Sequence, residues 1–185
     1  SCTSFTAVDC TGLTRLVSIG DAWLAGCTSL TLLDCTRLVQ LAAVGDDWLR
    51  GCTRLTTPLF RGLSRLAKVG DCWLANCTSL TLLDCTPMTQ LRAVGDDWLR
   101  DCASLTTLDC TKLATIGDGW LFGCSSLTAV KLRERTRTRL AHTTAMVTIA
   151  ALGIPQHVTK SPLCLFARAY GELLWRSLVT HTHLP

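Results

Sequence analysis

Histidine is scarce in this 185-residue chain and is confined to one end of it. His142, His157, His181 and His183 all lie after residue 140, outside the periodic part described below. Nucleophilic and acid–base catalysis need a base held within hydrogen-bond reach of the reacting group. No histidine is fixed beside a serine or cysteine of the periodic part, so the sequence does not predict an enzyme.

Compact metal-binding motifs are also lacking. The chain has 12 cysteines but no C-x-x-C pair, the arrangement on which structural zinc sites depend. The Gly-Asp pairs are not surrounded by the dense carboxylates that calcium requires. We therefore predict no metal and no cofactor. The cysteines are interpreted as small buried hydrophobic residues, and disulfides between stacked neighbours are the alternative.

No hydrophobic run is long enough for a clear membrane span. The apolar stretch at 140–154 falls short of the ~20 residues that a spanning helix needs, so membrane association is left open. The chain begins in mid-repeat without a methionine or a signal peptide. We therefore expect a fragment of a longer protein, whose compartment cannot be deduced from that absence.

What the sequence does contain is a repeat of 25 residues. Trp23, Trp48, Trp73 and Trp98 are spaced 25 apart, and Trp120 follows after 22. The segment 27–51 returns at 77–101 with few changes, which indicates recent duplication. A fixed period of this length predicts a solenoid, because one unit cannot bury its apolar residues without stacked neighbours.

Each unit is predicted to hold one strand and one short turn of helix. Leu30, Leu33 and Cys35 have the spacing of a strand with one buried side. The aspartate of the following Gly-Asp pair, Asp46, is expected to cap a short helix or 3₁₀ turn that ends at Gly51. The glycine of the pair is expected to provide a positive φ.

These motifs resemble those of a known family. L-x-x-L-x-C, repeated at Leu30, Leu80 and Leu105, resembles the strand motif of leucine-rich repeats, and V/I-G-D-x-W-L-x-x-C resembles the surface-antigen (BspA-like) subclass. Residues 83–88 are also similar to repeats of kinetoplastid and related protozoan proteins. The resemblance implies an α/β leucine-rich repeat solenoid. It would be right-handed, with a parallel concave sheet of about six strands and short helical or 3₁₀ convex turns.

The repeat array is predicted to occupy residues 1–132, with strands starting at Phe5, Leu30, Leu55, Leu80, Leu105 and Leu127. Proline removes a sheet donor, so Pro58 predicts a bulge or kink in the third strand. Residues 133–185 form a second, non-repeat region. Residues 131–185 hold eight Lys/Arg and two Asp/Glu, a net +6. This basic tail is expected to be a capping helix or disordered.

The side of the predicted sheet opposite the core is the candidate binding surface. Alternation points Leu33 and Cys35 inward, so the residues between and beside them face outward. The outward set includes a file of carboxylates, for which a basic ligand and a merely solvated sheet face are both open interpretations. The candidate protein-binding residues are Asp9, Leu32, Asp34, Thr36, Leu82, Asp84, Thr86, Thr107, Asp109 and Thr111.

The sequence therefore predicts a non-catalytic protein-interaction module, expected to be a monomer that does not bind nucleic acid. The four arginines at 133–139 make too short a patch, without interleaved aromatic residues, for nucleic acid. The resemblance implies a cell-surface or secreted protein, similar to an antigen or adhesin. The alternative is an intracellular adaptor, such as the substrate-recognition repeat of an F-box-type ubiquitin ligase, in which the cysteines stay reduced.

Overall fold

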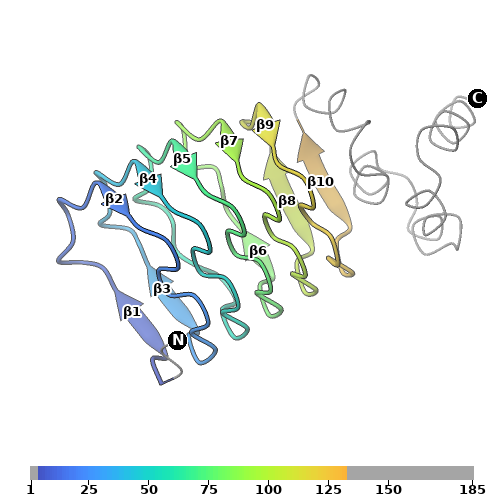
Figure 1. The fold of residues 1–185 in the computed structure, drawn as a ribbon, viewed down its shortest axis with the longest axis horizontal. Coiled ribbons are helices and arrows are strands. Elements are labelled where there is room, and N and C mark those ends of the chain that lie inside the picture. Colours follow the sequence, from blue (N-terminus) through green and yellow to red (C-terminus); the bar gives the residue numbers. More distant parts are fainter. Residues whose placement is uncertain (1–3, 133–185) are drawn as a thin grey trace, which may run out of the picture.

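The computed structural model describes residues 4–132, which form a parallel β-solenoid (Figure 1). Each repeat unit makes one rung, and successive rungs stack side by side. We number the rungs 4–26, 27–51, 52–76, 77–101 and 102–123, and residues 124–132 begin a sixth. The predicted tail features, namely the arginines at 133–139, the histidines and the capping helix, lie outside the described residues.

The first sheet is built from one short strand in each rung except the third. Strands β1 and β3 pair with each other, and β6, β8 and β10 form a separate group, all with parallel neighbours. The third rung has no strand here. It is joined to the second rung by an isolated bridge between Asp34 and Leu59, and to the fourth by a hydrogen bond from Thr81 N to Thr56 O at 3.1 Å. The strands are β1 Ala7–Asp9, β3 Leu32–Asp34, β6 Leu82–Leu83, β8 Thr107–Cys110 and β10 Ala129–Leu132.

The prediction of a continuous six-stranded sheet is therefore wrong in the third rung. Pro58 has no N–H to donate to a neighbouring strand, and the expected bulge or kink takes the form of an interruption of the sheet. The remaining strands also begin later than predicted. For example, β3 starts at Leu32 rather than Leu30.

A second parallel sheet was not predicted. Its order is β2-β4-β5-β7-β9, and it runs along one edge of the solenoid (Figure 1). Each strand has only two residues, directly before the glycine of the Gly-Asp pair, so no alternation was long enough to reveal it. The strands are β2 Ser18–Ile19, β4 Ala43–Val44, β5 Lys68–Val69, β7 Ala93–Val94 and β9 Thr115–Ile116.

The predicted helical turns are also wrong, because the described residues contain no helix. In the second rung, Asp47, Leu49 and Gly51 have φ values of 57°, 62° and 71°, whereas a right-handed helix needs negative φ throughout. Their amides bond to neighbouring rungs instead. Asp47 N donates to Asp71 O at 2.8 Å, and Leu49 N donates to Trp23 O at 3.1 Å. The segment is thus a ladder between rungs. The described part also contains no helix that is long and apolar enough to cross a membrane.

The core lies between these three sides of the solenoid. Tryptophans of adjacent rungs stack with ring centroids 5.4–6.4 Å apart, and Trp48, Trp73, Trp98 and Trp120 are fully buried. Leucines of each rung are covered by the leucines of the next. The aromatic stack is therefore continuous along the array.

Cysteines contribute to the same packing. The ten cysteines among the described residues are free thiols. The Cys52 thiol donates to the Leu24 carbonyl at 3.1 Å, and the Cys77 thiol donates to the Leu49 carbonyl at 3.2 Å. Burial raises the pKa of Cys52 to about 12, which makes its thiolate rare at neutral pH. These thiols behave as buried packing groups that also link rungs.

Candidate functional site

The candidate site is the outward face of the first sheet. Leu32 is 47% exposed and Leu82 is 46% exposed, whereas their strand neighbours Leu33 and Leu83 are buried. The sides of the strands are thus as the alternation predicted. The outward positions of the ten predicted residues repeat from rung to rung, so residues far apart in sequence form columns on one face.

The carboxylates of this face each close a local turn. Asp34 Oδ1 accepts a hydrogen bond from Thr36 N at 2.8 Å. The hydrogen bonds from Thr36 lower the pKa of Asp34. Equivalent backbone bonds join Asp9 to Thr11, Asp84 to Thr86 and Asp109 to Thr111. These are Asx turns, which the recurring D-x-T spacing could have revealed but which we did not predict.

The carboxylates form a column across the rungs. Asp9 lies opposite Asp34 in the strand register, and Asp34 bridges to Leu59 of the third rung. At the other end, Lys131 Nζ is 3.9 Å from Asp109 Oδ2. Hydrogen bonds from Thr111, together with the charges of Lys131 and Lys112, lower the pKa of Asp109. The column therefore ends at Asp109, whose negative charge is partly balanced by Lys131.

Leu59 is a site residue that was not among the predicted ten. It stands where other rungs carry aspartate, is 37% exposed, and interrupts the carboxylate column between Asp34 and Asp84. Leu32 of the second rung and Leu82 of the fourth are also exposed on this face, so the three middle rungs each add one apolar side chain to it. Exposed apolar groups of this kind are typical of binding surfaces when they cluster.

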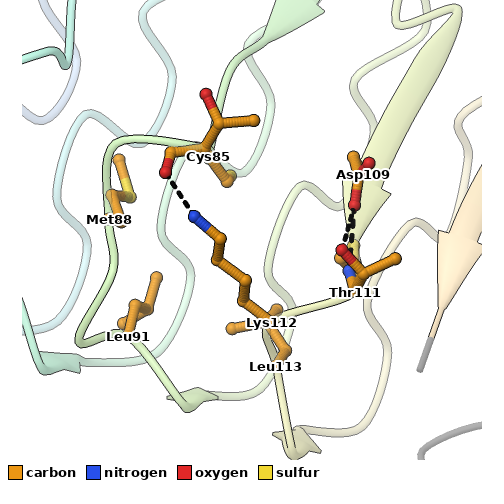
Figure 2. Close-up of a pocket in the computed structure, with 9 residues that line it drawn as sticks. Cys85, Met88, Leu91, Asp109, Thr111, Lys112 and Leu113 are labelled. Atoms are coloured by element: carbon orange, nitrogen blue, oxygen red, sulfur yellow. Dashed lines mark hydrogen bonds between the residues drawn. The ribbon is translucent and has the colours of Figure 1, made fainter.

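A small crevice opens beside this face between the fourth and fifth rungs (Figure 2). Met88, Leu91 and Leu113 form its apolar wall, and the ammonium of Lys112 donates to the Thr86 carbonyl across it. The fifth rung is shorter here, because Thr115 pairs with Ala93 at a separation of 22 residues. The crevice has a volume of about 40 Å³, enough for about one water and too small for an organic ligand.

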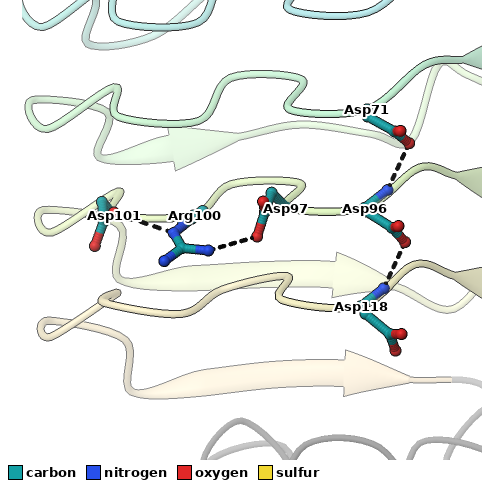
Figure 3. A network of polar contacts seen from close by, with 6 residues as sticks. All are labelled: Asp71, Asp96, Asp97, Arg100, Asp101 and Asp118. Carbon is teal, nitrogen blue, oxygen red and sulfur yellow. Dashed lines mark hydrogen bonds and ion pairs between the residues drawn. The ribbon is translucent and has the colours of Figure 1, made fainter.

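The Gly-Asp pairs form a second carboxylate column on another edge of the solenoid (Figure 3). Asp71 Oδ1 accepts from Asp96 N at 2.8 Å, and Asp96 Oδ1 accepts from Asp118 N at 2.8 Å. The prediction that these aspartates cap their own helical turn is wrong, because the first four of the five accept a hydrogen bond from the next rung instead.

The positive φ expected at the glycine of each Gly-Asp pair is also wrong. The glycines with positive φ are Gly26, Gly51, Gly119 and Gly123. None of them belongs to a Gly-Asp pair, unlike Gly45, Gly70, Gly95 and Gly117. A Cβ at Gly70 would lie 2.1 Å from Asp46 Oδ1. Glycine is needed there because the preceding rung approaches too closely for a side chain.

One ionic network lies near this second column. Arg100 is 2.9 Å from Asp97 and 3.5 Å from Asp101, and its guanidinium lies 4.9 Å from the centre of the Phe122 ring (Figure 3). In the described part of the chain, no cluster of three or more His, Cys, Asp or Glu side chains is arranged to hold a metal ion. This network joins the fourth rung, which holds Arg100, to the fifth rung, which holds Phe122.

Comparison with known proteins supports the repeat assignment. A family model described as BspA type leucine rich repeat region matches six copies over residues 1–128 and 60–170. No curated protein matches the chain, and no solved structure matches it.

Proposed function

We propose, because the chain belongs to the BspA-type leucine-rich repeat family, that it binds a protein ligand through the outward face of its first sheet. Repeats of this family suggest a protein-interaction module and are generally non-catalytic. The observation that carries the proposal is the face itself. Its side chains stand in register on stacked rungs whose core is continuous, so the surface is rigid and extended.

The chemistry of the face favours a basic ligand with an apolar anchor. Within the described residues, Lys131 is the only cation that lies within 4 Å of a carboxylate of this column, at Asp109. The carboxylates of Asp34 and Asp84 flank Leu59 and have no such partner there. A ligand that places an aliphatic or aromatic side chain against Leu59 and a Lys or Arg beside it would satisfy both features.

The proposed setting is the cell surface or the extracellular space, with an antigen-like or adhesin-like role. This follows from the family, whose members are typically surface or secreted proteins. Binding through many equivalent rungs suits such a role, because the contact area grows with the number of repeats.

An intracellular adaptor is the second candidate, and the free thiols favour it. Four thiols, three of them buried, donate to main-chain carbonyls 25 or 28 residues earlier in the chain, as Cys102 does to Leu74 O at 3.1 Å. A disulfide would remove those donors. Alkylation of denatured protein, purified without reductant from its source and analysed by mass spectrometry, separates the two settings. Alkylation of all 12 cysteines favours the adaptor, and protected pairs favour a secreted protein.

The binding proposal is tested with a displayed library of random peptides. Peptides selected on the wild-type protein are expected to be basic with an apolar residue, and to lose binding to the variant Asp34→Asn/Leu59→Ser/Asp84→Asn. The control for charge is Asp47→Asn/Asp97→Asn, which also removes two negative charges but from another side of the solenoid. Equal binding to both variants would contradict the assignment of the surface.

A further inference from the structure

Charge is segregated around the solenoid in a way that the first-sheet face does not explain. We define the second side as residues 10–20, 35–45, 60–70, 85–95 and 110–117, which run from the end of the first sheet through the second sheet. These segments contain no Asp or Glu. They contain seven cations, namely Arg15, Arg37, Arg61, Arg65, Lys68, Arg92 and Lys112.

The rest of the described chain has the opposite balance. It holds all twelve aspartates of residues 4–132 and only four cations, Arg50, Arg54, Arg100 and Lys131, a net charge of 4 − 12 = −8 against +7 for the second side. The second side thus lies between the two carboxylate columns; in the second rung, for example, it is bounded by Asp34 and Asp46. Its chemistry suits a different partner from the one proposed for the first sheet.

The cations of the second side form no ion pair among the described residues, although Arg37 and Lys112 act on the carboxylates of Asp34 and Asp109 through their charge. None of the seven lies within 4.0 Å of an Asp oxygen, whereas Arg50, Arg100 and Lys131 all do. Those that have contacts donate to neutral groups. Arg92 donates to Thr89 O at 2.9 Å, and Arg65 donates to the side chain of Gln40. All seven side chains are exposed, so their charge is available to a ligand.

The surface that carries these cations is flat. Ser18, Ala43, Lys68, Ala93 and Thr115 occupy equivalent outward positions of the second sheet in successive rungs. Apart from Lys68 these side chains are small. An extended chain can therefore approach the sheet closely, while the longer Arg and Lys side chains reach it from the segments that precede its strands.

We propose that the second side binds an acidic polypeptide segment. Five of the seven cations are arginines, whose planar guanidinium groups bind carboxylates in pairs of parallel hydrogen bonds. Single-stranded nucleic acid is disfavoured, because no exposed aromatic side chain among the described residues of this side could stack on a base. The cations gather on rungs three to five, where the described second side has no large exposed apolar residue to anchor in a membrane.

The test is the affinity of a fluorescent peptide of alternating Glu and Ser, measured by anisotropy at low and high salt. The variant Arg61→Gln/Arg65→Gln/Lys68→Gln/Arg92→Gln is compared with Arg50→Gln/Arg54→Gln/Arg100→Gln/Lys131→Gln. Both remove four positive charges and leave residues 133–185 unchanged. The urea midpoint of each variant is measured to establish that it is folded.

The second-side variant is expected to weaken binding by about tenfold or more, and the control by less than about threefold, because exposed charge contacts add up only where they meet the ligand. Equal losses in the two variants, or undetectable binding of the peptide by the wild-type protein at low salt, would overturn the proposal. So would preferential binding of duplex DNA or of phosphatidylserine vesicles that depends on the same four residues. None of these results bears on the basic ligand of the first sheet.

Discussion

Replacing Gly70 by alanine tests the close contact between rungs most sharply. The added Cβ would lie 2.1 Å from Asp46 Oδ1 and 2.7 Å from both Asp46 N and the Gly45 carbonyl carbon. Two of these three contacts are with backbone atoms, which cannot move aside like the end of a flexible side chain. The hydrogen bond from Asp71 N to Asp46 Oδ1, 2.9 Å long, would be lost or lengthened.

The expected cost combines two losses and one gain. Overpacking of a tight contact costs about 1–3 kcal/mol, and an exposed hydrogen bond contributes about 1 kcal/mol. The reduced entropy of the unfolded chain returns about 0.4–1 kcal/mol. Gly70→Ala is therefore expected to destabilise the array by about 1–3 kcal/mol, measured as a lower urea midpoint of tryptophan fluorescence.

The first rung provides the matched control. A Cβ at Gly20 would meet nothing within 4 Å, although Gly20 occupies the same position of the motif. Gly20→Ala is expected to leave stability unchanged or to raise it by up to about 1 kcal/mol. If the two substitutions shifted the midpoint equally, the close approach of the rungs would not be the reason for glycine at this position.

Three further predictions concern the core and the carboxylate column. Trp73→Ala is expected to lower the free energy of unfolding by about 3–5 kcal/mol. Trp23→Ala is expected to lower it less, because Trp23 is only partly buried and stacks on a single indole. Urea denaturation of the two variants measures the difference. Asn in place of Asp34, Asp84 and Asp109 is expected to lower the thermal midpoint only slightly, because the amide oxygen still accepts from threonine but does so less strongly than a charged carboxylate. A large loss would refute the orientation of the strands. The pKa values of Asp34 and Asp109 are lowered on folding, so these two carboxylates stabilise the fold at pH values above their ordinary pKa of 3.8. This stabilisation is lost as the pH falls through their lower folded pKa values. The urea midpoint is therefore expected to drop in that acidic range, and to drop less in the Asp109→Asn variant.

The sequence sufficed for features that depend on periodicity. The spacing of Trp48 and Trp73 predicted stacked rungs, and the alternation around Leu33 predicted which side of the first sheet is buried. Both depend on apolar side chains that recur at fixed positions, and burial of such side chains is the main driving force for packing. The repetition multiplied a signal that one rung alone would not have provided.

Features that depend on contacts between rungs could not be predicted from the sequence. Asp46 was interpreted as a helix cap, because a Gly-Asp pair before an apolar residue is a usual helix start. The structure instead bonds it to the next rung, and the positive φ at Asp47 and Leu49 rules out a helix. No local propensity encodes this conformation, since it is stabilised by carbonyl groups 24 and 26 residues away.

The candidate site was anticipated in part. The ten predicted residues lie in columns beside the first sheet, but their carboxylates also close Asx turns, which was not foreseen. The sequence places Leu59 as an interruption in the file of carboxylates, and the strand register, which joins it to Asp34, agrees. The structure adds that its side chain is exposed on this face.

The central claim, that the outward face of the first sheet is the ligand surface, is tested most directly by hydrogen–deuterium exchange with a peptide selected from the displayed library. The account predicts slower exchange on binding in residues 30–34, 55–59 and 80–84. Protection confined to residues 38–44, 63–70 and 88–95 of the second side would contradict it, as would unchanged exchange throughout the array at saturating peptide.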